Sequence, residues 1–290
     1  MTRMAKMTGS TILMLALAAI MLMTTAPIVA QDDVEAARGG ATIVRASAGP
    51  VPRLPSGKPD LQGYWQPRSN GGFPTNNLEE HPPSFLRGGG KSLISDPPDG
   101  KFPYQPWAIA ERDRRRLPQN SYDDPDGHCF LSGVPRIMDF NFQTLQTPTD
   151  IVMLFEYIHA QRVIHTDERK HAPGRIRLWQ GDSIGHWEGD TLVVDTTNNN
   201  GKTWLELSGN FVSDAETVVE RFTMVDSNNI EWQATVTDPK VYTRPWTMKM
   251  THLRQAPGNY GLLEEACHED NQDLAHTRAV QRAAQGQKTR

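Results

Sequence analysis

The chain has 290 residues, of which 37% are hydrophobic and 22% are charged, and its formal net charge at pH 7 is −4. That length allows one large domain or two small ones. A nucleic-acid-binding protein would show a basic stripe or patch, so this nearly balanced charge excludes nucleic acid as an expected partner.

The N-terminus predicts a signal peptide over residues 1–30. Arg3 and Lys6 precede an apolar run at 12–23, and small residues follow up to Ala30. This order is typical of an export signal, and the apolar run is shorter than the roughly 20 residues of a membrane-spanning helix. We therefore expect Sec-type export, cleavage near Ala30, a periplasmic or secreted protein, and no membrane contact after cleavage.

The rest of the chain is expected to hold one structured domain. Residues 31–58 lack apolar periodicity and are rich in Ala, Gly, Pro and Ser, which predicts a disordered lead-in. A single barrel-like domain is expected over 59–270, and a polar tail with some helical character over 271–290. The domain includes a long loop at 67–103, dominated by Gly, Pro, Asn and Ser; a loop of this length is usually functional or loosely ordered.

One short helix and a series of strands are predicted within this domain. Pro106 favours a helix start, and Pro118 limits its end. Strands are predicted at the start of the domain and then near 143–147, 151–157, 162–166, 183–187, 191–197, 216–225, 229–237, 246–255 and 260–267. The links between them are short and rich in turn residues, and none is long and apolar enough to form a crossover helix, so a parallel sheet is not expected. This pattern predicts an antiparallel meander that closes into a lipocalin-like barrel, with a two-sheet β-sandwich as the alternative.

The clearest turn lies between the strands near 183–187 and 191–197. Glu188, Gly189 and Asp190 separate two runs with strong β character. A tight hairpin turn requires positive φ, which glycine adopts without steric cost. We expect Gly189 to adopt that conformation.

Alternation along two late strands places large apolar side chains on one face. Such a face either lines a ligand cavity or fills a core, and both interpretations remain open. The function favoured by this pattern is the binding of a small, largely apolar or aromatic molecule inside the barrel. The residues predicted to bind it are Trp232, Trp246, Met248, Met250 and His252.

The alternative function is a lyase, isomerase or hydrolase that needs no cofactor. A base, an acid and an anion-binding group occur within one stretch, where they are predicted to act at the mouth of the barrel. These candidate catalytic residues are Glu156, His159, Arg162, His165 and Asp167. Phosphate-binding loops, dinucleotide fingerprints and the nucleophile motif of α/β-hydrolases are absent from the sequence, so no cofactor is expected.

Two cysteines, Cys129 and Cys267, are expected to form a disulfide, because exported proteins with an even cysteine count usually pair them. The alternatives are free thiols or a zinc site with His128 and His268, although ligands adjacent in the chain rarely aim at one ion.

A second metal site can be built from His165, Asp167 and His186, but the spacing gives no specific support and no metal site is predicted. Asp195 is expected to pair with Arg221 or Arg244.

Two resemblances accompany these observations. Gly63-Tyr64-Trp65 resembles the first strand of lipocalin-type barrels, which implies that an arginine on a late strand, Arg254, stacks on Trp65. The chain also resembles a widespread family of exported bacterial proteins, which implies an extracytoplasmic β domain and no particular reaction. That second resemblance rests on DLQGYW (60–65), FEYIHAQRVIHTD (155–167), GDSIGHWEGDTLVVDTTN (181–198), VVERF (218–222) and DPKVYTRPW (238–246).

Overall fold

The computed structural model describes residues 48–68, 78–82, 90–255, 261–269 and 271–286. The chain divides into two units, Met1–Ile43 and Val44–Arg290, and every described residue belongs to the second. The predicted signal peptide, 1–30, lies outside the described residues. No helix in the described part of the chain is long and apolar enough to cross a membrane.

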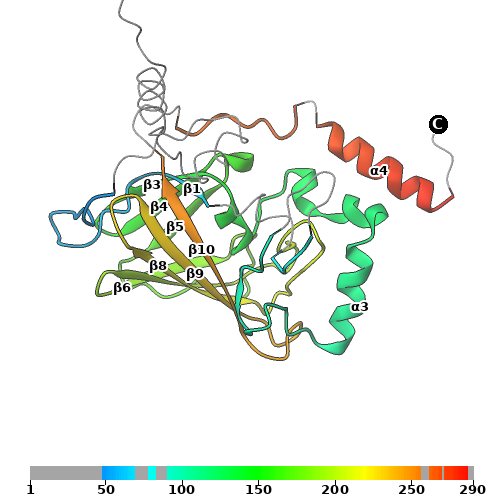
Figure 1. The fold of residues 1–290 in the computed structure, drawn as a ribbon, viewed down its shortest axis with the longest axis horizontal. Helices are drawn as coiled ribbons and strands as arrows, with labels where there is room; N and C mark the ends of the chain where they lie inside the picture. Colours follow the sequence, from blue (N-terminus) through cyan, green and yellow to red (C-terminus); the bar gives the residue numbers. More distant parts are fainter. Residues whose placement is uncertain (1–47, 69–77, 83–89, 256–260, 270, 287–290) are drawn as a thin grey trace, which may run out of the picture. The chain divides into compact units, whose positions relative to one another are not determined.

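A closed β-barrel forms the centre of the structure (Figure 1). Nine strands follow one another around it in the order β1-β3-β4-β5-β6-β7-β8-β9-β10, and β1 pairs again with β10. The short β2 is added beside β10. The strands are β1 (Gly63–Pro67), β2 (Ile94–Asp96), β3 (Phe142–Gln146), β4 (Asp150–Phe155), β5 (Gln161–His165), β6 (Asp182–Glu188), β7 (Thr191–Thr197), β8 (Thr217–Met224), β9 (Asn229–Thr237) and β10 (Trp246–Arg254). The predicted mainly β barrel is confirmed.

One strand pair departs from the predicted antiparallel meander. β5 and β6 run parallel, with Ile164 opposite Ser183 and His165 opposite Ile184. The prediction of antiparallel pairing throughout was wrong at this pair. Parallel neighbours need a crossover of a dozen or more residues. The link between these strands, 166–181, is long enough to provide it without a helix.

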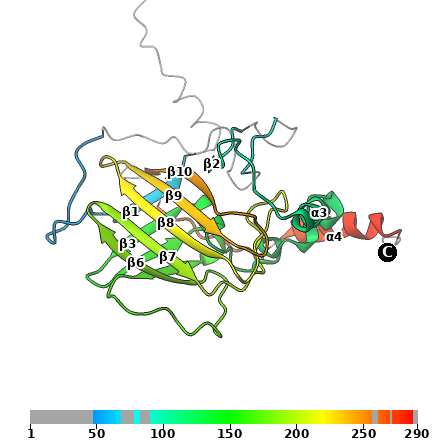
Figure 2. The same ribbon diagram turned by 90° about the horizontal axis from the view of Figure 1, so that it is seen from below.

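The hairpin between β6 and β7 forms as predicted. Trp187 lies opposite Leu192 and Glu188 opposite Thr191, which leaves two residues in the turn. Gly189 has a φ of 59°, in the left-handed region that a side chain disfavours. Figure 2 shows β7 to β10 side by side in the barrel wall that continues from this hairpin.

The remaining elements are helical. α3 (Pro106–Arg115) confirms the predicted short helix, and α4 (Gln272–Ala284) lies in the predicted tail. Four short 3-10 helices complete the described part: η3 (Pro118–Asp123), η4 (Pro125–His128), η5 (Arg136–Asp139) and η6 (Tyr157–His159).

The predicted strand at 260–267 is absent over its described residues. The backbone amide of Leu263 instead lies 3.3 Å from Glu156 Oε2, and Cys267 is bonded to Cys129. These contacts to side chains replace the ladder hydrogen bonds of a strand.

Two segments that were expected to be disordered or loosely ordered are packed against the barrel. Val51 packs on the core, and Arg53 forms a two-pronged ion pair with Asp190 at 2.6 and 2.8 Å. The predicted disorder of 31–58 therefore does not hold for 48–58. Within the predicted loop, Leu78 and Phe102 are buried in the core. Part of that loop thus covers the barrel rather than extending into solvent.

Candidate functional site

The predicted aromatic ligand residues lie in the barrel interior, where other side chains surround them. Trp232 and Trp246 are at most 1% exposed. The Trp246 ring meets Phe102 edge-on at 4.8 Å between centroids, and Trp232 Nε1 donates to Glu220 Oε1 at 3.1 Å. In this conformation both tryptophans fill space and present no open face to a ligand.

His252 is fully buried beside the ring of Trp232. Its Nε2 lies 2.8 Å from the carbonyl oxygen of Met138, and Nδ1 has no hydrogen-bond partner among the described residues. Burial lowers the pKa of His252 to about 4. The imidazole is therefore neutral at physiological pH, donating through Nε2 and leaving an acceptor on Nδ1.

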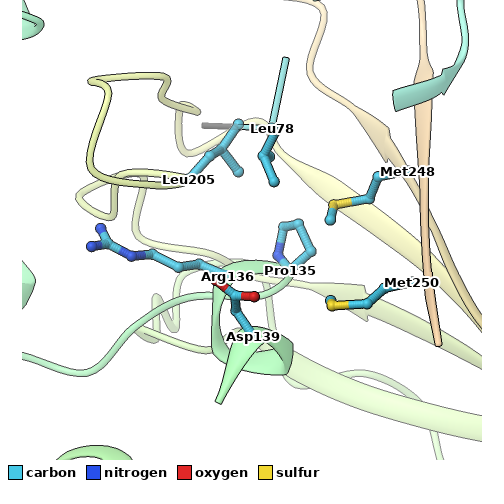
Figure 3. A pocket seen from close by; sticks show the side chains of 7 residues that line it. All are labelled: Leu78, Pro135, Arg136, Asp139, Leu205, Met248 and Met250. Atoms are coloured by element: carbon cyan, nitrogen blue, oxygen red, sulfur yellow. The ribbon is translucent and has the colours of Figure 1, made fainter. Parts of the chain in front are cut away.

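Met248 and Met250 project from β10 into a cavity (Figure 3). The volume of this cavity is about 10 Å³. That is close to the minimum needed for one water molecule and too small for an aromatic ligand without rearrangement. The other lining residues come from segments outside the barrel wall: Leu78, Pro135, Arg136, Asp139 and Leu205.

A buried group of charges adjoins this cavity. The Arg136 guanidinium, directed away from the cavity in Figure 3, donates two hydrogen bonds of 3.0 Å to Asp124. Its Nε lies 2.9 Å from Asp126 Oδ2, which also accepts from Ser132 Oγ at 2.6 Å. Burial raises the pKa of Asp126 to about 6; Arg136 opposes this rise and Asp124 adds to it.

A second buried ion pair crosses the barrel interior. Arg162 Nη1 donates to Glu220 Oε1 at 3.0 Å, and Nη2 makes a close contact with Glu220 Oε2. Ser183 Oγ and Thr196 Oγ1 accept further hydrogen bonds from the same guanidinium. Arg162, predicted to bind a substrate anion, thus binds an internal carboxylate.

The five predicted acid–base residues occupy three separate places. Glu156 and His159 lie at the turn between β4 and β5, whereas Arg162 points into the barrel. His165 ends β5 at the opposite end of that strand, where its Nδ1 lies 2.7 Å from Asp150 Oδ1. Asp167 is bound by Arg169 at 2.6 Å. The described structure does not bring these side chains together at a barrel mouth.

The turn that separates them carries no glycine or proline. Ile158 and His159 instead adopt φ values of 47° and 49°. The amide of Ile158 donates to Glu265 Oε2 at 2.5 Å, so a side chain distant in sequence stabilises the reversal. This explains why the local sequence gave no signal for it.

A histidine–carboxylate group that was not predicted from the sequence lies on the outer barrel wall. His171 Nδ1 is 2.8 Å from Asp182 Oδ2, and His171 Nε2 is 3.7 Å from Asp195 Oδ2. The predicted partners of Asp195 were wrong: Arg221 pairs with Glu188 and Arg244 with Asp96. The only part of this group that the sequence could indicate is the β6–β7 hairpin, because its register places Asp182 and Asp195 on the outward face.

The cysteines are bonded to each other, with their Cα atoms 5.8 Å apart, as predicted. They are therefore not zinc ligands. Within the described ranges, no group of three or more His, Cys, Asp and Glu side chains is arranged to hold a metal ion.

Arg254 lies over the Trp65 ring, 4.3 Å from its centroid, so the expected contact between these two side chains is present. It also donates from Nε to the carbonyl of Ser227 at 2.6 Å and from Nη1 to that of Gln62. A Cβ atom on Gly63 would lie 2.3 Å from Arg254 Nη1, and Gly63 has a φ of 131°. Glycine is favoured there because a side chain is strained at this φ, and the end of the Arg254 side chain lies where a Cβ atom would be.

The described fold defines a closed β-barrel protein of mixed strand direction. Comparison with family models, curated proteins and solved structures finds no match for this chain.

Proposed function

We propose that this protein binds a small, largely apolar or aromatic molecule at the cavity beside Met248 and Met250. The observation that carries this proposal is the pairing of two thioethers on the barrel wall with an apolar cover from outside the wall, Leu78, Pro135 and Leu205. Ligand sites are usually apolar with a few fixed polar groups. Arg136 and Asp139 border the same space.

Binding requires this cavity to enlarge, because its present volume accommodates about one water molecule. Methionine suits such a change: its unbranched side chain has three rotatable bonds and repacks around irregular shapes. Leu78 belongs to the predicted long loop, so a ligand at this place would contact both the loop and the barrel. Binding would change the fluorescence of Trp232 and Trp246.

The direct test is a fluorescence titration with N-phenyl-1-naphthylamine, an uncharged aromatic probe. Wild-type protein is expected to bind it saturably. Met250→Phe adds about the volume of that space, so it should fill the cavity and abolish binding, with the circular dichroism spectrum unchanged. Val219→Ala is the control, because Val219 is 41% exposed on β8, and probe binding should be unchanged.

Stability measurements separate a ligand cavity from a filled core. A core methionine truncated to alanine costs about 2–5 kcal/mol of unfolding free energy. If Met248 and Met250 line a ligand site, Met248→Ala and Met250→Ala should cost less and change probe affinity. Large losses at both positions and at Trp232→Ala, without any change in probe binding, would rule out this function.

We further propose that the protein is exported and acts in the periplasm or outside the cell, as a member of the exported family it resembles. The signal-peptide pattern over residues 1–30 and the Cys129–Cys267 disulfide support this, since disulfides persist in oxidising compartments. N-terminal sequencing of protein from its native host should begin near Gln31. An intact N-terminus on cytoplasmic material would contradict export.

A further inference from the structure

We infer that His171 and Asp195 form a two-ligand site for a divalent transition-metal ion such as Zn²⁺ on the outer wall of the barrel. Asp182 acts as the residue that orients the imidazole. The site is separate from the cavity proposed to bind a small molecule, which lies inside the barrel. Three observations carry it: the fixed imidazole, the position of the second carboxylate, and the local charge.

The imidazole is fixed by a carboxylate that is itself anchored. Asp182 Oδ2 accepts from the backbone amide of Ala172 at 2.9 Å as well as contacting His171 Nδ1 at 2.8 Å. Asn198 Nδ2 donates to the carbonyl of Ala172 at 2.9 Å and ties the same loop to the end of β7. With the proton on Nδ1, the lone pair of Nε2 points away from Asp182. Metal-binding histidines commonly have a carboxylate in this position.

The second carboxylate lies at the distance a shared ion requires. His171 Nε2 and Asp195 Oδ2 are 3.7 Å apart, too far for a hydrogen bond. Two ligands about 2.1 Å from a tetrahedral zinc ion lie about 3.4 Å apart, so a small side-chain adjustment brings both into the coordination sphere. The remaining positions would be taken by water, since the described residues supply no third ligand.

The charge and exposure of this place also suit a cation. The Asp195 side chain is 53% exposed and that of His171 is 27% exposed, so an ion can enter from solvent. Within the described residues, Asp195 has no Lys or Arg at ion-pair distance. Arg169 interacts with Asp182 through its charge, but its guanidinium is already paired with Asp167 at 2.6 Å. One nitrogen and one oxygen ligand favour Zn²⁺ over Mg²⁺ and Ca²⁺, which prefer oxygen alone.

The chain contains a matched control for this arrangement. His165 also has a carboxylate on Nδ1, that of Asp150 at 2.7 Å, but no second carboxylate lies within 4 Å of its ring nitrogens among the described residues. A histidine–aspartate pair alone would make both places bind zinc equally. The proposed site predicts that only the His171 group does.

The test is calorimetric titration of untagged protein with ZnCl₂, repeated with MgCl₂. Zinc is expected to bind with one-to-one stoichiometry and a Kd below about 1 mM, with no comparable heat from magnesium. His171→Ala and Asp195→Asn should each weaken zinc binding at least about tenfold, and Asp182→Asn by about 10–100-fold. His165→Ala should leave the affinity unchanged.

Nuclear magnetic resonance of the histidine rings gives an independent readout, in which zinc should shift the His171 resonances before those of His165. Because these side chains are partly exposed, the variants should keep the wild-type melting temperature without zinc. The inference is overturned if zinc does not bind, if His171→Ala binds as wild type does, or if His165→Ala loses affinity equally.

Discussion

Arg136 and Arg162 are both buried, but their charges are balanced in different ways. Arg162, inside the barrel, meets one carboxylate, that of Glu220, together with hydroxyl groups. Arg136, in η5, meets two carboxylates, those of Asp124 and Asp126. One guanidinium cannot neutralise both, and burial raises the pKa of Asp126 to about 6. The barrel pair is thus a balanced structural element, whereas the second group is sensitive to pH.

The same two regions also differ in covalent support. Cys129, which follows η4 and lies close in sequence to Asp124 and Asp126, is bonded to Cys267 across 138 residues. The barrel strands contain no cysteine, so no disulfide joins them. The region outside the barrel wall therefore depends on an oxidising environment in a way that the barrel does not.

The largest effect is expected from removing that bond. A loop of this length corresponds to about 4–5 kcal/mol in the chain-entropy description, although measured values are often smaller. Cys129→Ser with Cys267→Ser should lower the unfolding free energy accordingly, as measured by guanidinium denaturation. Thiol titration of denatured, unreduced wild type should find no free thiol. Two free thiols would refute the bond itself.

The next largest effect is expected for Arg162→Met. It leaves the Glu220 carboxylate buried without its cation, which typically costs about 3–5 kcal/mol. Urea unfolding measures this loss. The double variant Arg162→Met, Glu220→Leu should recover part of it, because neither charge of the pair remains, although Trp232 Nε1 loses its acceptor. A double variant as unstable as the single one would show that the pair is needed for more than charge balance.

The third prediction concerns Asp126 and pH. Its pKa rises on folding from 3.8 to about 6, so the stabilisation present below pH 4 is lost as pH rises through 6. The loss is on the order of a few kcal/mol, since each unit of pKa shift corresponds to about 1.36 kcal/mol. Asp126→Asn should flatten the stability profile between pH 4 and 7 relative to wild type. An unchanged slope would mean that Asp126 ionises normally in the folded protein.

The smallest effect is expected for a substitution in the β6–β7 hairpin that changes neither arginine. Gly189→Val forces a β-branched residue to a φ of 59°, which should cost about 1–2 kcal/mol. Differential scanning calorimetry should show a lower melting temperature. Val219→Ala, on an exposed face of the same wall, serves as the comparison. Equal melting temperatures for Gly189→Val and wild type would remove the turn assignment.

The sequence predicted what depends on neighbouring residues. The β6–β7 hairpin was found because alternation and a Glu-Gly-Asp turn lie within one short stretch, and α3 because a proline precedes its first turn. The Arg162–Glu220 pair was missed because its members are 58 residues apart. The His171 group depends on the β6–β7 register and on a loop held by Asn198, neither of which local periodicity encodes.

The burial of the predicted ligand residues could be predicted only in part from the sequence. Alternation correctly placed Trp232, Trp246, Met248, Met250 and His252 on the inward face. It did not predict how much of that interior other segments occupy. Met138 from η5 reaches His252, and Phe102 from the predicted loop reaches Trp246. Whether an inward face surrounds space or other side chains depends on segments far away in the chain.

The closure of the barrel also determines when folding can finish. β1 and β10 form the seam, and the contact of Arg254 with the carbonyl of Gln62 spans 192 residues. Contacts of such sequence separation slow folding, because a long chain segment must be ordered before they form. A ribosome must synthesise the chain through β10 before the first strand can acquire its second neighbour. Until then, β1 has an unpaired edge, the kind of surface on which other chains add strands.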